Sequence, residues 1–478
     1  MKTRRIIASI VVVFLLISML LSMIGFVFLT PSQYTASYYG VLPMMYENLK
    51  NTQGNKIVMI GTSNIAFGVD SELIEEELAK DGKNYQVCNF GLYGAIGTKA
   101  MLDLSRDYIK EGDIVIFSPE LNAQALSLYF SGIEMWRGID GHWEMLLDVA
   151  SEDMKAMVGA YPTFLGEKMS YLQKEETVNT GLVYSSASFN TRCDMKNADR
   201  EYNVLLGGYD SNNLISLDGD LYGDEFCDYV NAYYEDVKKV GAKMYFSFCP
   251  MNEKSIVDKS KEAVESFYSV ISEKLDFPII SSPNTYIMES EWFYDSNFHV
   301  NEAGMTYRTI RLIEDLKNVF GLTSPVETEI PEKPQPPQTD LVEGNNEFLD
   351  CFLYEESESN YIITALTEKG KNLTEITIPT TYQGKQIVSF KKEVFSGNTT
   401  IKEITIQENI RMLEDASFSG CTALEKIILE QTSPEKISVG YDLMNGTGNC
   451  FIYVKQEAVT TYLNNYFWST YTAWFKTY

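Results

Sequence analysis

The sequence predicts an α/β domain with a mainly parallel sheet, followed by a short β-solenoid domain. Before residue 323, apolar strand-like runs alternate with helical patterns, which is typical of a parallel sheet with helices on both faces. A proline-rich stretch at 323–345 then replaces any apolar period and predicts a semi-rigid spacer. After the spacer the sequence repeats itself, which indicates a solenoid at 346–478.

The N-terminus predicts a membrane anchor at residues 1–30. The run from Ile6 to Leu29 has no charged residue and follows Lys2, Arg4 and Arg5. It is long enough to cross a bilayer, and the basic flank predicts that everything after it lies outside the cytoplasm. A cleaved signal peptide is the alternative, with Thr35-Ala-Ser37 as a weak cleavage site.

The composition excludes several classes of function. The chain has 478 residues and a net charge of −27, which disfavours nucleic acid as a partner. Its seven cysteines show no Cys-x-x-Cys spacing, so we expect no metal and no other cofactor. A disulfide between Cys193 and Cys227 stays open beside the simpler interpretation of each cysteine as a small buried residue.

The predicted α/β domain covers 31–322, with five strands and five main helices. The strands are Lys56–Ile60, Tyr85–Phe90, Asp113–Ser118, Ala242–Phe248 and Pro278–Ser281. The helices are Ser71–Lys80, Thr98–Lys110, Asp224–Val240, Ser255–Lys274 and Asn301–Phe320. An insertion at about 123–222 includes a helical stretch at Trp143–Val158 and is either a lid beside the site or a structural elaboration.

A serine and a histidine far apart in the sequence suggest a nucleophilic site. Ser63 follows the first strand in a Gly-Thr-Ser turn, and parallel strands present such turns at one edge of the sheet. His299 is one of only two histidines, and Asp295 precedes it by four residues, close enough to orient its ring. The other histidine, His142, has no partner pattern and is interpreted as a turn or helix-start residue.

With these motifs the domain resembles the SGNH (GDSL-like) hydrolase superfamily, closest to its membrane-anchored DltD-like branch. The resemblance implies a flavodoxin-like three-layer fold and maps the nucleophile turn to Gly61-Thr-Ser63. It maps an oxyanion donor to Gly94 in Asn89-Phe-Gly-Leu-Tyr-Gly94, with Gly91 as the fallback. A second donor maps to Asn122 in Ser118-Pro-Glu-Leu-Asn122, although the family's flanking glycine and aspartate are absent there.

The last block departs from the family pattern by one residue. The family usually reads Asp-x-x-His, whereas this chain has Asp295-x-x-x-His299. Either the loop absorbs the extra residue and the three side chains form a triad, or Asp295 bonds only nearby backbone and Ser63 works with His299 as a dyad.

The C-terminal repeats resemble BspA-type leucine-rich repeats of bacterial surface proteins. Leu373–Pro379, Ile401–Gln407 and Leu424–Glu430 share one apolar alternation, and Val394-Phe-Ser-Gly397 is echoed by Ser417-Phe-Ser-Gly420. The resemblance implies an extracellular module for adhesion or protein contact, with a protein or glycan ligand that it does not identify.

Together these features predict a membrane-anchored esterase or O-acyltransferase on the bacterial cell surface. Its expected substrates are acyl groups on a cell-envelope polysaccharide, teichoic acid or peptidoglycan. The alternative is a catalytically inactive adhesion or scaffold protein that binds partners through its repeats.

Overall fold

The chain folds into two compact units in the computed structural model, the first made of most of residues 1–334 and the second made mainly of residues 335–478. The structure describes residues 25–92, 94–174, 183–196, 204–205, 208–210, 213–334, 346–357, 360–440, 443–465 and 468–478. Most of the predicted anchor, residues 1–24, lies outside these ranges. Across the described ranges, no helix has both the length and the apolar character needed to span a bilayer.

The first unit contains a four-stranded parallel sheet in the order β2-β1-β3-β4. The strands are β1 (Lys56–Gly61), β2 (Gln86–Gly91), β3 (Ile114–Ser118) and β4 (Lys243–Phe246). The fifth predicted strand is reduced to one parallel bridge between Ile279 and Phe246. The predicted parallel α/β class is confirmed.

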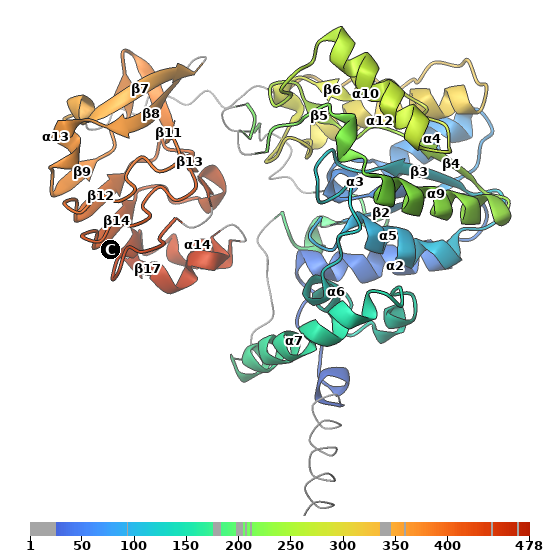
Figure 1. The fold of residues 1–478 in the computed structure, drawn as a ribbon, viewed down its shortest axis with the longest axis horizontal. Helices are drawn as coiled ribbons and strands as arrows, with labels where there is room; N and C mark the ends of the chain where they lie inside the picture. Colours follow the sequence, from blue (N-terminus) through green and yellow to red (C-terminus); the bar gives the residue numbers. More distant parts are fainter. Residues whose placement is uncertain are drawn as a thin grey trace, which may run out of the picture. The chain divides into compact units, whose positions relative to one another are not determined.

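Helices cover both faces of this sheet (Figure 1). On one face lie α4 (Ser71–Lys80) and α12 (Glu302–Val319); on the other lie α2 (Val41–Asn51), α5 (Thr98–Ser105) and α9 (Asp224–Lys239). The strands are buried on both faces and therefore read as continuous apolar runs. Leu312, Ile313 and Leu316 of α12 pack with inward side chains of β1, β2 and β3.

Local capping explains where two of these helices begin. The Asp70 side chain accepts a hydrogen bond from the Leu73 N–H at 3.1 Å, and the Asn301 side chain accepts one from the Gly304 N–H at 2.9 Å. Each bond satisfies a backbone donor that the first helical turn leaves open. The cap at Asn301, two residues after His299, also fixes the start of α12 at Glu302.

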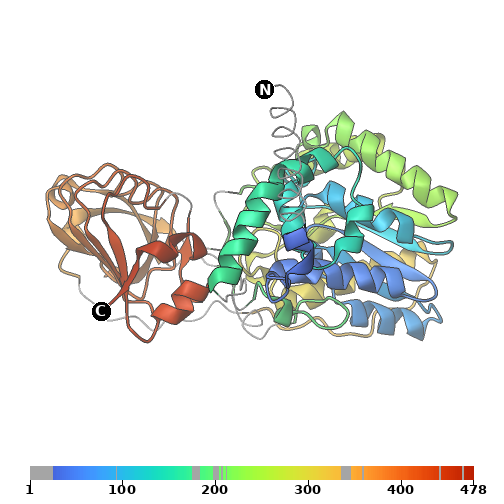
Figure 2. The same cartoon turned by 90° about the horizontal axis from the view of Figure 1, so that it is seen from below.

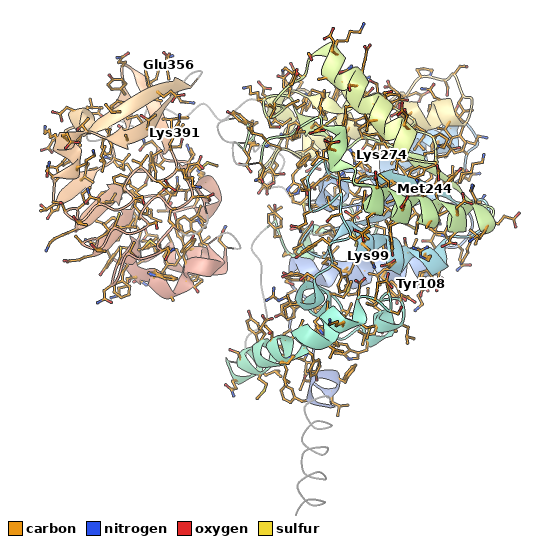
Figure 3. The ribbon with its side chains drawn as sticks, viewed as in Figure 1. Lys99, Tyr108, Met244, Lys274, Glu356 and Lys391 are labelled. Carbon is orange, nitrogen blue, oxygen red and sulfur yellow. The ribbon has the colours of Figure 1, made fainter. Side chains whose placement is uncertain are left out.

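The insertion contains α6 (Gly132–Gly138), a 3-10 turn at Trp143–Leu147 and the long α7 (Met154–Lys174). The predicted helical stretch at Trp143–Val158 is only partly confirmed, because the chain leaves helical geometry between these two elements. The Lys99 ammonium bonds Asp103 of its own helix and Asp153 before α7, and the Tyr108 hydroxyl donates to Asp148 at 2.8 Å (Figure 3). These contacts anchor the insertion to the α/β core.

The segment after β4 differs from its prediction. The strand β5 (Met251–Asn252) precedes α10 (Lys261–Lys274), and β6 (Ile287–Met288) follows the short α11 (Pro283–Tyr286). The two strands pair in a small parallel sheet. The helix was predicted to start at Ser255, which is wrong because the Ser255 hydroxyl donates to the Asn252 carbonyl at 2.7 Å and closes a turn. Ser260 is the actual cap, since its hydroxyl accepts from the Ala263 N–H.

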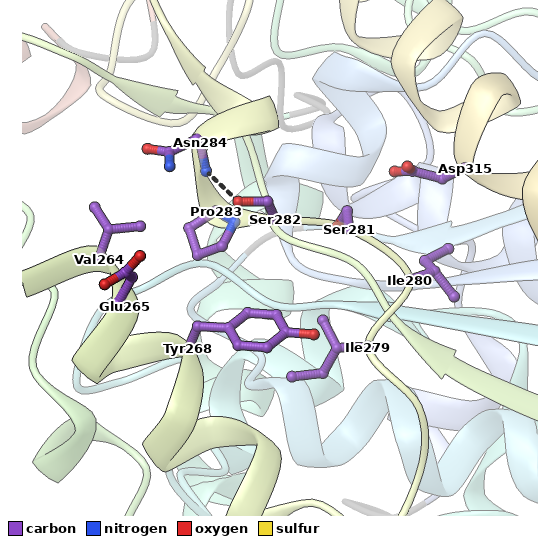
Figure 4. Close-up of a pocket in the computed structure, with 10 residues that line it drawn as sticks. All are labelled: Val264, Glu265, Tyr268, Ile279, Ile280, Ser281, Ser282, Pro283, Asn284 and Asp315. Atoms are coloured by element: carbon purple, nitrogen blue, oxygen red, sulfur yellow. Dashed lines mark hydrogen bonds between the residues drawn. The ribbon is translucent and has the colours of Figure 1, made fainter. Parts of the chain in front are cut away.

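A groove of about 650 Å³ lies on this side of the unit (Figure 4). Its lining comes from α10, the 279–284 segment and Asp315 of α12. In Figure 4 the Tyr268 and Ile279 side chains lie next to each other, and the Asn284 N–H donates to the Ser282 hydroxyl at 3.3 Å. The groove contains none of the residues expected to carry chemistry.

The second unit is a coil of mainly parallel strands, in which only the pairs β7–β8 and β10–β11 of the described residues are antiparallel (Figures 1 and 2). One ladder has the order β17-β16-β14-β12-β9, and another has β15-β13-β11-β8-β7 with β10 beside β11. The first comprises β9 (Glu375–Thr377), β12 (Glu403–Ile406), β14 (Lys426–Leu429), β16 (Phe451–Val454) and β17 (Phe475–Thr477). The second comprises β7 (Phe352–Ser357), β8 (Asn360–Leu366), β10 (Thr381–Tyr382), β11 (Lys385–Phe390), β13 (Met412–Leu413) and β15 (Ser438–Val439). The unit also contains two short α-helices, α13 (Glu368–Lys371) and α14 (Val459–Asn464).

Equivalent residues stack in successive turns of this coil. Ile404 pairs with Ile376 on one side and Ile427 on the other, and all three are buried. Phe395 and Phe418, from the two Phe-Ser-Gly motifs, lie 5.5 Å apart between ring centroids. The glycines that follow, Gly397 and Gly420, both have a φ near +70°, at +72° and +70°, where a side chain would be strained.

The first part of the predicted spacer belongs to the first unit. Residues 323–334 pack on the first unit, where Thr328 bonds Glu77 and Ser324 bonds Asp81, so the spacer begins later than residue 323. The rest of the spacer, 335–345, lies outside the described residues. All seven cysteines are buried and free, including Cys193 and Cys227, in agreement with their interpretation as small buried residues.

Candidate active site

Ser63 lies where β1 ends and the short helix α3 (Ser63–Gly68) begins. The turn is held by the Asn64 side chain, whose oxygen accepts from the Thr62 N–H at 3.2 Å and whose nitrogen donates to the Ser118 carbonyl at 3.0 Å. Gly61 and Gly91 are needed for close approach, because a Cβ would lie 2.4 Å from the Ser118 oxygen or 2.8 Å from the Thr62 oxygen. The glycines thus let the neighbouring strand ends hold the serine at the carboxyl edge of the sheet.

The structure brings His299 and Asp295 to this serine. His299 Nε2 lies 2.8 Å from Ser63 Oγ, and His299 Nδ1 lies 2.8 Å from Asp295 Oδ1. Because the carboxylate accepts at Nδ1, that nitrogen carries the proton and Nε2 faces the serine hydroxyl. The four-residue spacing therefore permits a Ser-His-Asp relay, and the geometry does not support the alternative of an aspartate confined to backbone contacts.

The loop between these two residues absorbs the extra residue. The Tyr294 N–H donates to the His299 carbonyl at 2.8 Å, and the Ser296 hydroxyl accepts from the His299 N–H at 3.1 Å. Asn297 points into the protein and donates to the carbonyls of Asp210 and Asn213 at 2.8 and 2.7 Å. These bonds fix the loop in the shape that turns Asp295 back onto the imidazole.

Two aromatic residues that the sequence analysis did not identify complete the setting of His299. The Phe67 ring of α3 stacks on the imidazole with centroids 4.1 Å apart and planes 5° apart. The Tyr184 hydroxyl, from the insertion, donates to Asp295 Oδ2 and lies 3.5 Å from His299 Nδ1. Burial and the charge of Asp295 raise the pKa of Tyr184 well above its usual value, so it remains a donor.

Glu120 is a second acid beside the serine, which the sequence analysis also did not select. Its Oε1 lies 3.1 Å from Ser63 Oγ and 3.0 Å from the Asn64 backbone nitrogen. Glu120 is buried, with 8% of its surface exposed. Its position two residues after β3 is the only sequence signal for it, because strand ends in parallel sheets converge on the site.

The two predicted oxyanion donors have different positions. Asn122 reaches the site through Glu120, since its Nδ2 donates to Glu120 Oε2 at 3.2 Å. Gly94 lies beside open space, because a Cβ there would meet no atom within 4 Å, and its carbonyl accepts from Gln124 Nε2 at 2.8 Å. The Asn64 N–H, which follows the nucleophile, is a further candidate donor.

The remaining polar groups do not suggest metal chemistry. In the described ranges, no three His, Cys, Asp or Glu side chains are grouped as metal ligands would be. His142 precedes the 3-10 turn at Trp143 and lies 3.8 Å from Glu144 at the surface. Its interpretation as a helix-start residue is confirmed.

Comparisons with known proteins add to the description of the second unit. No curated protein matches this sequence. A leucine-rich repeat protein of T. pallidum is 19% identical over 22% of this chain and 57% of its own, with a TM-score of 0.18. Protein YxiM of Bacillus subtilis is 13% identical over 56% of this chain and 58% of its own, with a TM-score of 0.28.

The match to a family model concerns the repeats alone. Six copies of the BspA type leucine rich repeat region match residues 362–469. These residues also form the stacked parallel strands described above. Residues 362–469 are therefore a BspA-type leucine-rich repeat region.

Proposed function

We propose that the first unit is a serine esterase or O-acyltransferase that acts on acyl groups of a cell-envelope polymer. The observation that carries the proposal is the hydrogen-bonded series from Ser63 Oγ through His299 to Asp295, with 2.8 Å at both contacts. A serine hydroxyl is a weak nucleophile until a base removes its proton, and the oriented imidazole supplies that base.

The proposed reaction has two halves. His299 Nε2 takes the proton of Ser63 as Oγ attacks the ester carbonyl, and the imidazolium is stabilised by Asp295, itself held by Tyr184. His299 then gives the proton to the leaving alcohol, and an acyl-Ser63 remains. Water or a polymer hydroxyl, deprotonated by His299, releases the acyl group in the second half.

The donors for the oxyanion come from three segments in this proposal. They are the backbone N–H groups of Ser63 or Asn64, Gly94 on the turn after β2, and the Asn122 amide. Each donor stabilises the charge that develops on the carbonyl oxygen, and loss of one such donor costs about 10²–10³-fold in rate in comparable hydrolases.

The proposed setting is the outer face of a bacterial membrane, with the N-terminal segment as an anchor. The uncharged run at 6–29 and its basic flank support this setting, and a polymer of the envelope is the substrate within reach. The ligand of the repeats is proposed to be a protein or glycan of the same compartment.

The test is ester turnover by the full-length protein in mild detergent. We expect hydrolysis of a chromogenic acetyl ester, and release or transfer of acetyl groups from acetylated wall polymer, both lost in Ser63→Ala. His142→Ala is the matched control and should retain full activity. Equal turnover by Ser63→Ala and the unchanged protein would remove the proposal.

A second candidate is an adhesion or scaffold protein with an inactive hydrolase-like unit. The observation that favours it is Glu120, whose acid group occupies the space beside the nucleophile. It predicts that binding to cells or wall survives Ser63→Ala but is weakened when Phe418→Ala destabilises the repeat region.

A further inference from the structure

The Glu120 carboxyl lies where a reacting ester would place its negative oxygen. In a tetrahedral intermediate the oxyanion is bonded to the same carbon as Ser63 Oγ and accepts from nearby backbone N–H groups. Glu120 Oε1 lies 3.1 Å from that Oγ and accepts from the Asn64 N–H at 3.0 Å. An acid of the protein itself therefore occupies the oxyanion position.

The number of protons around Ser63 Oγ limits the charge states of the site. Among the described residues, Oγ has two hydrogen-bond contacts, with His299 Nε2 at 2.8 Å and with Glu120 Oε1 at 3.1 Å. The serine hydroxyl supplies one proton and can donate to only one of them. In the second contact Oγ must accept a hydrogen bond, so the partner must carry a proton. That partner is either His299 as an imidazolium or Glu120 as a carboxylic acid.

These two arrangements differ in chemical competence. If the proton is on His299, the imidazole cannot act as a base and the Glu120 carboxylate repels a developing oxyanion. If it is on Glu120, His299 is free to take the serine proton, and the Glu120 O–H donates toward the oxyanion. Only the neutral acid is compatible with attack on an ester.

Among the described residues around Glu120, His299 is the basic group that can share this proton with it. In the part of the chain that the structure describes, the only basic group in ion-pair range is His299, with 3.9 Å between Nε2 and Oε1. Asp295 lies on the far side of the imidazole, and Asn122 is a neutral donor. Burial raises the pKa of the nearby Cys249 thiol to about 12, so this group stays neutral.

We propose that Glu120 is a gate on the oxyanion position. As a carboxylate it holds that position against a second negative oxygen and keeps Ser63 idle; as a neutral acid it gives way to the ester oxygen and donates a hydrogen bond to it. In the productive step Ser63 loses its proton to His299, the Oγ–carbon bond forms, and the carbonyl electron pair moves to the oxygen that Glu120 then hydrogen-bonds. Glu120 keeps its proton throughout, and the leaving alcohol takes the proton from His299. This gate rests on the proposed esterase function.

The test compares labelling of Ser63 by a fluorophosphonate in the full-length protein and in Glu120→Gln between pH 5 and pH 8. The glutamine side chain has the same shape, stays neutral and offers an N–H donor. We expect Glu120→Gln to react about tenfold faster or more at pH 8, as for the gain of an oxyanion donor. Taking the ratio at each pH cancels the ionisation of His299 that both proteins share.

Controls separate this inference from the esterase function. Glu144→Gln changes the acid next to the chain's other histidine and should label as the unchanged protein does. Glu120→Ala removes the carboxylate without adding a donor and should fall between the two. If Ser63 is labelled but Glu120→Gln is equal or slower at every pH, the gate is wrong and the esterase function stands. If neither protein is labelled at Ser63, both proposals fail.

Discussion

The two units bury polar groups in opposite ways. The α/β unit buries charges, among them the pairs Lys56–Asp113 and Lys168–Asp140. The described part of the repeat unit buries only neutral polar residues, and its ion pairs join side chains that are at least 30% exposed. The difference shows where chemistry is available, because buried ionisable groups can have shifted pKa values and exposed ones rarely do.

The neutral groups of the repeat unit have a structural role. Asn409 is 1% exposed, and its Nδ2 donates to the Ile387 carbonyl at 2.6 Å and also reaches the Pro379 and Thr380 carbonyls. Such a residue satisfies backbone that the strands leave open. The repeat unit is thus organised for regular stacking, while the α/β unit holds reactive groups in a fixed place.

The largest expected effect separates the two histidines of the α/β unit. His299→Ala removes the proposed base, and we expect ester turnover to fall about 10⁴-fold or more. His142→Ala should leave turnover unchanged. Steady-state kinetics on a chromogenic ester measures both, and a similar loss in the two variants would contradict the role of His299.

The next effect belongs to the repeat unit. Phe418 is fully buried between Phe390 and Phe395, so Phe418→Ala should lower the free energy of unfolding of this unit by about 3–5 kcal/mol. Calorimetry should show a lower transition temperature with ester turnover preserved. Leu353→Ala, at a side chain that is 52% exposed, is the control. A loss of turnover in Phe418→Ala would show that the units are not separate in function.

A pH effect on stability that comes from buried carboxyl groups should appear in the α/β unit. Burial raises the pKa of Asp315 from 3.8 to about 6, so the folded unit binds more protons than the unfolded chain between pH 4 and 6 and loses stability as pH rises through that window. Asp315→Asn still accepts from Tyr286, and it should gain about 2–3 kcal/mol at pH 7 and almost nothing at pH 4.

Chemical denaturation at both pH values measures this gain. Burial also raises the pKa of Asp194 to about 6. The stability of Asp315→Asn should therefore still depend in part on pH. Asp276→Asn, at an exposed position after α10, should change stability at neither pH. An equal gain of Asp315→Asn at pH 4 and pH 7 would show that the raised pKa of Asp315 is not the cause.

The smallest effect concerns the orientation of Asp295. Tyr184→Phe removes one donor to this carboxylate and should lower kcat by about tenfold, with KM little changed, because the hydroxyl acts through Asp295. Tyr268→Phe, in the groove of Figure 4, should have no effect on kcat. An unchanged kcat in Tyr184→Phe would limit the tyrosine to packing.

Local patterns predicted the fold and part of the site. Buried parallel strands are continuous apolar runs, so β1 to β4 were located to within two residues at each end, and the turn after β1 identified Ser63. His299 is predictable as a candidate base because the chain has only two histidines. The repeats were visible because each turn of the coil has the same inward positions, such as Ile376, Ile404 and Ile427.

The rest depends on contacts between distant residues. Tyr184 reaches Asp295 across 111 residues from an insertion without a clear period. Glu120 lies in the same short segment as Asn122, and the family pattern drew attention to the asparagine, whereas the geometry places the acid against Ser63. The predicted boundaries of α-helices at Ser255 and Trp143 differ from the structure because a turn and a 3-10 helix, respectively, take their place.

The proposed reaction requires that Ser63 forms a covalent acyl intermediate. The most direct measurement is mass spectrometry of the full-length protein quenched in acid shortly after mixing with an acetyl ester. We expect one added acetyl group on the peptide that contains Ser63, and none in Ser63→Ala. An unmodified Ser63 peptide during active turnover, or an acetyl group at another residue, would contradict it.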